Sequence, residues 1–387
     1  MKKKLVVVSY AACASILGDY MSASILDLEG RPDSGDSNGN PLRRVPLIQI
    51  AGIDDMDQEW GYCVLDSILY MSGEKKSVYK VDLSKLSTCT SETGNYRAEK
   101  MHAEMLSEKK SPVATAISMP DGSERVLVFS TRDLCADPSI RKTTDFEIYD
   151  PNSGIWVGLP GSDIWGDDAA VWFDIVAFTV PKNKSLLLIQ TYSDDSSIYA
   201  LDFLSPHVGW QKRETYLGVK SIPFDNSPHS LFVDDEICLT GYGAYDILEK
   251  APGTGLSHVM LYRRMGTYGK NPSRFFSFPQ QQLLEHSPEW CFYKSISPLV
   301  TLLGYDSNSG DCEFCVVHLG LNRFDSSAWI QQFVYKFNLK EYRAEKREKK
   351  GAGGEAAKLR IHILKHSSFQ AVRAPCIYFD ACYLNSF

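Results

Sequence analysis

The sequence of 387 residues predicts an all-β protein, and three observations support this prediction. Aromatic residues make up 12% of the chain, and such residues pack well on the pleated surface of strands. Segments that alternate apolar and polar residues recur along the chain, several of them ending in an Asp. The two ends of the chain supply three strands and one strand, which together complete a four-stranded unit. These features predict a six-bladed β-propeller with four strands per blade, whose first blade is closed by N-terminal strands plus the C-terminal strand.

The clearest unit is the segment FEIYDPNSGIWVGLP at residues 146–160. Its first five residues alternate with the period of two that is expected of a strand. The PNSG that follows favours a turn, because Pro presets its own φ while Asn and Gly tolerate positive φ. The chain then restarts a strand with IWVGL, and the second Pro ends it. We therefore expect a β-hairpin whose Trp156 is buried between two blades.

Related segments place the same residue type at the end of a strand. Three of them carry an Asp in the place of Asp150, and a fourth carries an Asn. The five residues at these strand ends are separated by 55, 68, 52 and 136 positions in sequence, and the last interval holds an additional repeat. A period of roughly 50–70 residues with four strands in each unit is typical of a β-propeller. The equivalent residues are Asp27, Asp82, Asp202 and Asn338.

Each unit divides into four strands, and the two ends of the chain share the first blade. KKLVVVSY, ASILDLEG and VPLIQIAG supply three strands, and PCIYFDACYL supplies the fourth. The alternative for the first segment is a signal peptide, because a lysine cluster precedes an apolar run. We favour the strand, because ring closure removes exposed sheet edges. The single domain 1–387 then has blades at 1–51 with 374–387, 58–107, 112–160, 171–217, 228–280 and 290–370.

The hairpin at 146–160 also carries features of a known repeat. A Tyr-Asp-Pro sequence is followed by Trp156 and then by Leu-Pro, and the next unit has Tyr199 and Trp210 in corresponding places. This pattern resembles the kelch repeat, although the paired glycines of that repeat are here MSG, TGYG or absent. The chain as a whole resembles plant (grass) kelch-like propeller proteins, and the predicted strands leave no room for an F-box before them. The resemblance implies a divergent kelch-type propeller.

One face of the predicted propeller is the candidate binding surface. Loops between second and third strands, and loops that lead to the next blade, gather on one face around the channel mouth. Several of these loops combine acidic and aromatic residues, which suit a basic or Arg-containing peptide. The alternative is that the acidic residues are solvated turn residues. The predicted partner-binding residues are Trp165, Asp167, Asp168, Tyr192, Asp194, Asp195, Arg132 and Tyr245.

Other motifs favour structural interpretations. Adjacent Asp residues could serve a glycosidase as acid and base, but the sequence lacks the repeated S-x-D-x-G-x-T-W box of sialidase propellers. Cys312 and Cys315 belong to one predicted strand, where residues three apart lie on opposite sides. His362 and His366 share a strand face, and no further metal ligands are predicted beside them. We therefore expect no metal and no cofactor.

The segment EYRAEKREKKGAGGEAAK at 341–358 is rich in charge. It lacks the G-x-x-x-x-G-K-[ST] spacing of a phosphate-binding loop. Its basic residues suggest a nuclear signal, but Glu345 and Glu348 interrupt the basic cluster. We predict a charged, flexible hairpin loop.

Composition limits the function classes. The net charge of −7 argues against nucleic-acid binding, and 10 scattered cysteines fit reduced thiols in the cytoplasm or nucleus better than a disulfide scaffold. No apolar run approaches the roughly eighteen residues of a membrane span. We predict a monomeric, non-enzymatic module that binds a protein or peptide partner through one loop face, without nucleic acid or membrane. The alternative is a small-molecule or carbohydrate-processing propeller enzyme.

Overall fold

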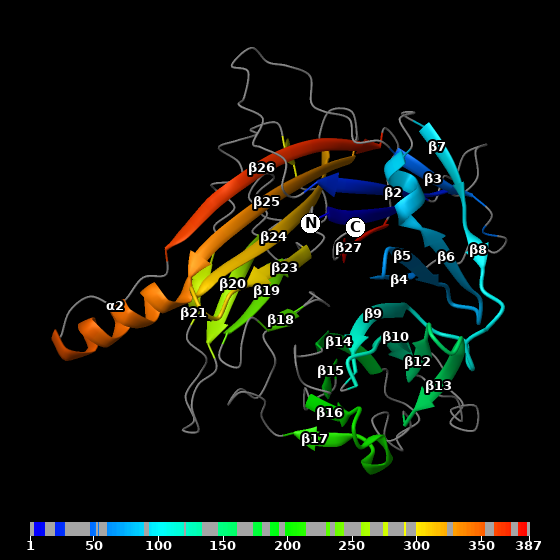
Figure 1. Cartoon of the computed structure of the whole chain (residues 1–387), viewed down its shortest axis with the longest axis horizontal. Coiled ribbons are helices and arrows are strands. Elements are labelled where there is room, and N and C mark those ends of the chain that lie inside the picture. The colour runs from blue at the N-terminus through cyan, green and yellow to red at the C-terminus, as the bar shows by residue number, and fades with distance from the viewer. Residues whose placement is uncertain are drawn as a thin grey trace.

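The computed structural model is dominated by antiparallel β-sheets (Figure 1). In the described part of the chain the strands form six sheets of four or five strands, and the prediction of a mostly β protein is confirmed. The structure describes residues 4–11, 20–27, 47–51, 53, 60–88, 93–119, 121–133, 146–160, 173–179, 186–192, 198–213, 230–232, 237–243, 257–263, 274–277, 290–291, 299–322, 328–352, 360–372 and 378–384.

The first sheet unites the two ends of the chain. Its strand order is β27-β1-β2-β3-β7. β27 pairs antiparallel with β1, from Lys4 opposite Leu384 to Tyr10 opposite Tyr378, so the predicted pairing of these two strands is confirmed. β7 joins the far edge by pairing parallel with β3, which the sequence did not indicate. The bounds are β1 Lys4–Ala11, β2 Tyr20–Asp27, β3 Leu47–Ala51, β7 Thr93–Arg97 and β27 Tyr378–Leu384.

The second and third sheets are built from strands that are nearly consecutive in sequence. Their orders are β4-β5-β6-β8 and β13-β12-β10-β9. The last strand of the second sheet, β8, is only two residues long, and beyond it the N–H of Met101 donates to the carbonyl of Val78 at 2.8 Å. The bounds are β4 Gly61–Leu65, β5 Ile68–Ser72, β6 Val78–Asp82, the 3-10 helix η1 Leu83–Thr88, β8 Glu99–Lys100, β9 Pro112–Ser118, β10 Glu124–Ser130, β12 Phe146–Asp150 and β13 Ile155–Leu159.

The fourth to sixth sheets follow the same antiparallel plan. Their orders are β11-β14-β15-β16-β17, β18-β19-β20-β21 and β22-β24-β25-β26, with β23 also paired to β24. The bounds are β11 Arg132–Asp133, β14 Phe173–Thr179, β15 Leu186–Tyr192, β16 Ile198–Asp202, the 3-10 helix η4 Pro206–Val208, β17 Gln211–Arg213, β18 Ser230–Phe232, β19 Ile237–Gly243, β20 Ser257–Arg263, β21 Arg274–Ser277, β22 Trp290–Cys291, β23 Leu299–Tyr305, β24 Asp311–Asn322, β25 Ala328–Asn338 and β26 Ile361–Val372.

Neighbouring sheets contact one another in the order of the sequence. β4 contacts both β27 and β9, β18 contacts both β14 and β23, and β23 contacts β27, so the last sheet returns to the first. Gly61 shows how closely β4 and β9 approach, because a Cβ added there would lie 2.7 Å from the backbone nitrogen of Ala114. Figure 1 shows the sheets following one another around this circuit.

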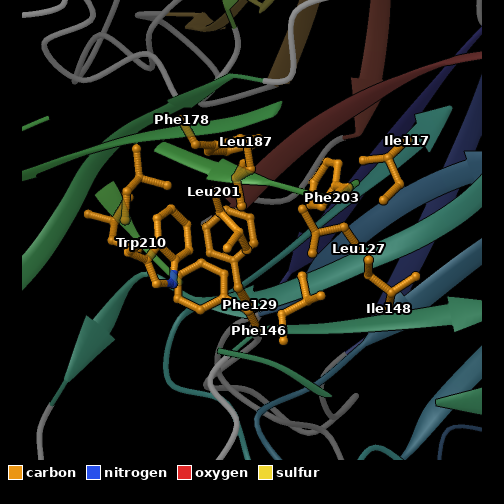
Figure 2. Packing of buried hydrophobic residues seen from close by; sticks show 13 residues of the cluster. Ile117, Leu127, Phe129, Phe146, Ile148, Phe178, Leu187, Leu201, Phe203 and Trp210 are labelled. Carbon is orange, nitrogen blue, oxygen red and sulfur yellow. The ribbon is translucent and has the colours of Figure 1, made fainter. Parts of the chain in front are cut away.

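A hydrophobic core joins the third sheet to the fourth (Figure 2). The rings of Phe129 and Phe146 stack with centroids 5.2 Å apart, and Trp210 of the next unit lies 4.8 Å from Phe146. Phe178 of β14 meets Phe129 edge to face at 5.1 Å. Aromatic pairs in this geometry add to the stabilisation from buried area. The high aromatic content of the sequence is thus used where consecutive sheets pack together.

The hairpin predicted at 146–160 is present as β12 and β13. Gly154 has φ +71°, and its N–H donates to the carbonyl of Asp150 at 2.8 Å. Trp156 is 6% exposed, and its Nε1–H donates to the carbonyl of Ala103 at 3.1 Å. Its neighbours come from both the second and the third sheets. The predicted burial of Trp156 between two sheets is confirmed.

Three of the Asp residues that repeat along the sequence share one structural role, while the residues that follow Asp27 lie outside the described residues. Each of the three stands at the end of a third strand, where its carboxylate accepts the N–H two residues later and begins a turn. These hydrogen bonds are 3.0 Å at Asp82, 2.9 Å at Asp150 and 2.9 Å at Asp202. Trp210 resembles Trp156 as well, because its Nε1–H donates to a carbonyl of the preceding unit, that of Pro160, at 2.5 Å. The sequence period therefore reflects repeated turns and repeated contacts between units.

The helix α2 (Leu339–Ala352) contradicts the predicted hairpin loop over residues 341–352, and the rest of that prediction, 353–358, lies outside the described residues. Asn338 caps the helix by accepting the N–H of Glu341 at 2.9 Å. Leu339 and Tyr342 are buried at its start, and the Lys, Arg, Glu and Ala residues that follow are strong helix formers. The prediction gave weight to charge and neglected helix propensity. In the described ranges no helix is long and apolar enough to cross a membrane.

Candidate functional site

The structure describes two of the predicted partner-binding residues and brings their backbones together. Arg132 of β11 lies opposite Asp174 of β14, and Tyr192 at the end of β15 lies opposite the same Asp174. The N–H of Ile175 also donates to the carbonyl of Thr131 at 2.7 Å. The segment that leaves the third sheet therefore begins as a strand of the fourth. The described strand ends at Asp133, Phe173 and Tyr192 thus lie at one end of one sheet, and the residues that connect them, 134–145, 161–172 and 193–197, lie outside the described residues.

The other predicted residues lie outside the described residues. Each belongs to a loop whose flanking strands are described: the loops follow β13, β15 and β19. The structure thus places the ends of these loops relative to one another and leaves the residues within them as predictions. These residues are Trp165, Asp167, Asp168, Asp194, Asp195 and Tyr245.

A second cluster of polar residues is buried between the second and third units. Lys109 and Glu147 form an ion pair in which both side chains are 0% exposed. The Lys109 ammonium also donates to the Ser107 hydroxyl at 2.6 Å. The Glu147 carboxylate accepts the N–H of Leu106 at 2.6 Å, the N–H of Ser107 at 2.9 Å and the Ser107 hydroxyl at 2.8 Å. Both buried charges are thus paired and hydrogen-bonded, as burial requires.

A serine beside a lysine is also the arrangement of Ser–Lys hydrolases. In such enzymes the neutral amine accepts the proton of the hydroxyl. Here the Lys109 ammonium is held by Glu147, and Ser107 is 3% exposed, so neither a free base nor a path for substrate is present. The cluster instead ties the segment before β9 to the middle of the third sheet. Sequence reasoning missed it, because Glu147 alternates with apolar neighbours as an exposed strand residue would.

The cysteine and histidine motifs of the sequence lie within strands. Cys312 and Cys315 both lie in β24, as predicted, and both are fully buried. His362 lies in β26 and is exposed, and His366 belongs to the same strand. Among the described residues no group of three or more His, Cys, Asp or Glu side chains could hold a metal ion.

The pKa shifts of the described groups arise from turns, surface ion pairs and burial. The Ser84 hydroxyl donates to Asp82 and lowers the pKa of that carboxyl. Lys336 donates to Asp311 at 2.9 Å, which lowers the pKa of Asp311 and raises the pKa of Lys336. Burial raises the pKa of Tyr70 to about 12. Each of these shifts has a structural cause.

Comparison with known proteins assigns this chain to no family. No family model matches the chain, and no curated protein matches its sequence. The structure is similar to a periplasmic gluconolactonase of Pseudomonas aeruginosa, with 8% identity, a TM-score of 0.39 and coverage of 98% of this chain and 99% of that chain. It is also similar to the extracellular domain of BT4673 of B. thetaiotaomicron, with 10% identity, a TM-score of 0.30 and coverage of 87% and 51%.

Both of these proteins have propeller-like folds. Because both TM-scores are below 0.5, we transfer nothing about activity from either protein to this chain. The protein is a mostly β protein built from several antiparallel sheets.

Proposed function

We propose that this protein is a six-bladed, kelch-type propeller with four strands per blade, and that it binds a partner protein or peptide through one loop face. The order in which the sheets contact one another supports the propeller, since the sixth sheet returns to the first. The repeated Asp turns and the two Trp residues that donate to preceding units support the kelch-type repeat. We propose the blade boundaries predicted from the sequence, except that β7 pairs in the first sheet and β11 in the fourth.

The observation that carries the binding proposal is the row formed by Arg132, Asp174 and Tyr192. In this row the end of β11, the start of β14 and the end of β15 lie at one end of the fourth sheet, and this supports the proposal that the loops 134–145, 161–172 and 193–197 form one binding surface there. Loops presented by a rigid sheet scaffold are a common way to build a binding surface. The sequences of these loops contain several carboxylates and Trp165, so a surface formed by them would suit a partner with Arg or Lys residues.

In the proposed binding mode an aromatic side chain supplies much of the binding energy, and charged side chains accelerate association. A large ring at the centre of an interface carries much of the binding energy, and Trp165 has this role. Exposed carboxylates mainly accelerate association, and salt screens them. Asp167, Asp168, Asp194 and Asp195 supply these charges. We expect the protein to act as a monomer in the cytoplasm or nucleus, where the buried thiols of Cys63, Cys312 and Cys315 stay reduced.

The test begins with affinity purification and mass spectrometry, which identify a partner, followed by measurement of its binding kinetics. Trp165→Ala should weaken binding by about 2 kcal/mol or more, mainly through faster dissociation. The Asp167→Asn/Asp168→Asn variant should slow association and flatten its salt dependence. Asp121→Asn is the matched control, because it removes one exposed carboxylate from the turn between β9 and β10, at the other end of the third sheet.

Two results would contradict the proposal. The first is that both Trp165→Ala and Asp167→Asn/Asp168→Asn bind the partner as the parent does. The second is hydrolysis of small sugar lactones or glycosides by the purified protein, which would support the alternative of a carbohydrate-processing propeller enzyme.

A further inference from the structure

The strand β13 lies at the outer end of the third sheet, with β9 at the inner end (Figure 1). Among the described residues, the backbone of β13 pairs with that of β12 alone. In an antiparallel pair every second residue directs its N–H and C=O away from the partner strand. The outer edge of β13 therefore presents a short row of backbone donors and acceptors that another strand can pair with.

Two apolar side chains of β13 are exposed beside this edge. Ile155 is 57% exposed and Val157 is 53% exposed, whereas Trp156 between them is buried. Residues i and i+2 of a strand lie on the same face, so Ile155 and Val157 form a β-branched pair on one face. A strand that paired with β13 would place its own side chains directly opposite these two, and β-branched side chains make favourable cross-strand pairs.

The outermost strands of the other described sheets differ from β13 in charge. Proteins protect strand edges with charged side chains, Lys above all, because a charge there disfavours pairing with another chain. β13 contains no charged residue. In each of the other five described sheets the outermost strand contains a Lys or an Arg, namely Arg97 of β7, Lys100 of β8, Lys212 of β17, Arg274 of β21 and Lys365 of β26. The third sheet thus lacks a protection that the other described sheets have.

The charges around β13 favour an uncharged strand as the partner. Next to the start of β13, the Asp150 carboxylate lies 3.5 Å from the Arg125 guanidinium, so these two charges neutralise each other. The net charge of −7 repels a nucleic acid or an acidic segment, and it also opposes approach of a second copy of this chain. An uncharged strand meets none of this repulsion. At about 3.4 Å per residue, a segment of about 17 Å covers the five residues of β13.

We propose that the outer edge of β13 is a docking site for an uncharged extended segment of another protein, which pairs with β13 and extends the third sheet. Hydrogen bonds between the two backbones supply affinity, and Ile155 and Val157 select apolar side chains at alternate positions of the segment. This inference does not depend on the loop-face function, because β13 contains none of the proposed loop residues. The Asp167→Asn/Asp168→Asn variant should therefore bind the segment as the parent does.

The test uses the full-length protein and a fluorescein-labelled peptide of alternating Val and Thr residues, with binding measured by fluorescence anisotropy. Val157→Lys should bind this peptide roughly three- to tenfold more weakly, because it removes an apolar cross-strand contact and places a charge on the edge strand. The matched control is Val208→Lys, since Val208 is 55% exposed and lies in the 3-10 helix η4. The control should bind as the parent does. Circular dichroism checks that both variants are folded.

Two further measurements distinguish strand pairing from an unspecific apolar contact. Backbone amides within residues 155–159 should exchange more slowly with deuterium when the peptide is bound, because pairing protects the N–H groups of the outer edge. A second peptide, with Pro in place of two neighbouring central residues, keeps its apolar character but lacks N–H donors on both of its edges. This peptide should bind at least roughly tenfold more weakly than the first, since two ladder positions are lost.

Four outcomes would overturn the proposal. The first is that the parent protein does not bind the Val–Thr peptide. The second is that Val157→Lys and Val208→Lys weaken binding equally. The third is that the Pro-containing peptide binds as tightly as the first, or that amide exchange in residues 155–159 is unchanged, which would mean that the backbone edge is not used. The fourth is a concentration-dependent rise in mass that Val157→Lys abolishes, which would mean that a second copy of this chain occupies the edge.

Discussion

The replacement of Trp156 by Ala tests how the units are held together. The side chain is 6% exposed, lies against residues of both the second and the third sheets, and packs in a tilted arrangement against Tyr149 with ring centroids 5.1 Å apart. Loss of a large buried ring typically costs about 3–5 kcal/mol, and the hydrogen bond to the carbonyl of Ala103 contributes about 0.5–1.5 kcal/mol of this. Trp156→Ala should therefore lower the free energy of unfolding by roughly 3–5 kcal/mol.

Urea unfolding followed by far-ultraviolet circular dichroism measures this loss without relying on Trp fluorescence. Trp156→Phe retains an aromatic ring and removes the N–H donor, so its free energy of unfolding should lie between those of the parent and the Ala variant. Val157→Thr is the matched control, because Val157 is the next residue of β13, is 53% exposed and is replaced by a β-branched residue of similar shape. Its effect should stay within about 0.5 kcal/mol. A cost below about 1 kcal/mol for Trp156→Ala would refute the reasoning that this ring joins two units.

The remaining predictions concern the buried ion pair, ring closure and alkaline pH. Lys109→Met should lower the free energy of unfolding in urea by roughly 3–5 kcal/mol, because Glu147 is left as an unpaired buried charge. The double variant Lys109→Met/Glu147→Leu should recover part of this loss. If the effects of the two single changes simply added, the pairing would be contradicted. Deletion of residues 374–387 should give insoluble protein, since β1 loses its partner β27; a soluble variant with an unchanged melting temperature would contradict closure. The pKa of Tyr70 is raised to about 12, so the stability that its neutral form contributes is complete below pH ~10 and is lost as the pH rises toward 12. When the free energy of unfolding is measured from pH 9 to 12, it should fall less steeply for Tyr70→Phe than for the parent.

The elements that the sequence predicted well depend on local patterns. The turn at 151–154 follows from the conformational preferences of Pro, Asn and Gly, and the flanking strands follow from alternation. The pairing of β1 with β27 was predicted by counting strands at both ends of the chain. At the turn a short stretch of residues specifies the backbone, whereas the pairing of β1 with β27 follows from the number of strands that the whole chain supplies.

The elements that the sequence did not predict depend on partners that are distant or on competing preferences. The Lys109–Glu147 pair joins residues 38 apart, and no local pattern links them. The parallel pairing of β7 with β3 likewise joins two units. α2 was missed because charge density favours a solvated loop while the same residues have high helix propensity. For the candidate site, Arg132 and Tyr192 came together because β11 pairs with β14, a contact between units that alternation cannot reveal.

The pairing of β1 with β27 has a consequence for the time course of folding. These two strands are separated by almost the whole chain, so β1 leaves the ribosome long before its partner exists. At about 5–20 residues per second, synthesis of the intervening chain takes roughly 20–75 s. During this interval one edge of β1 stays open to other nascent chains, which makes it a site where chaperones would be needed. A contact between residues so far apart also raises the contact order, so the closing step should be slow compared with the formation of each sheet.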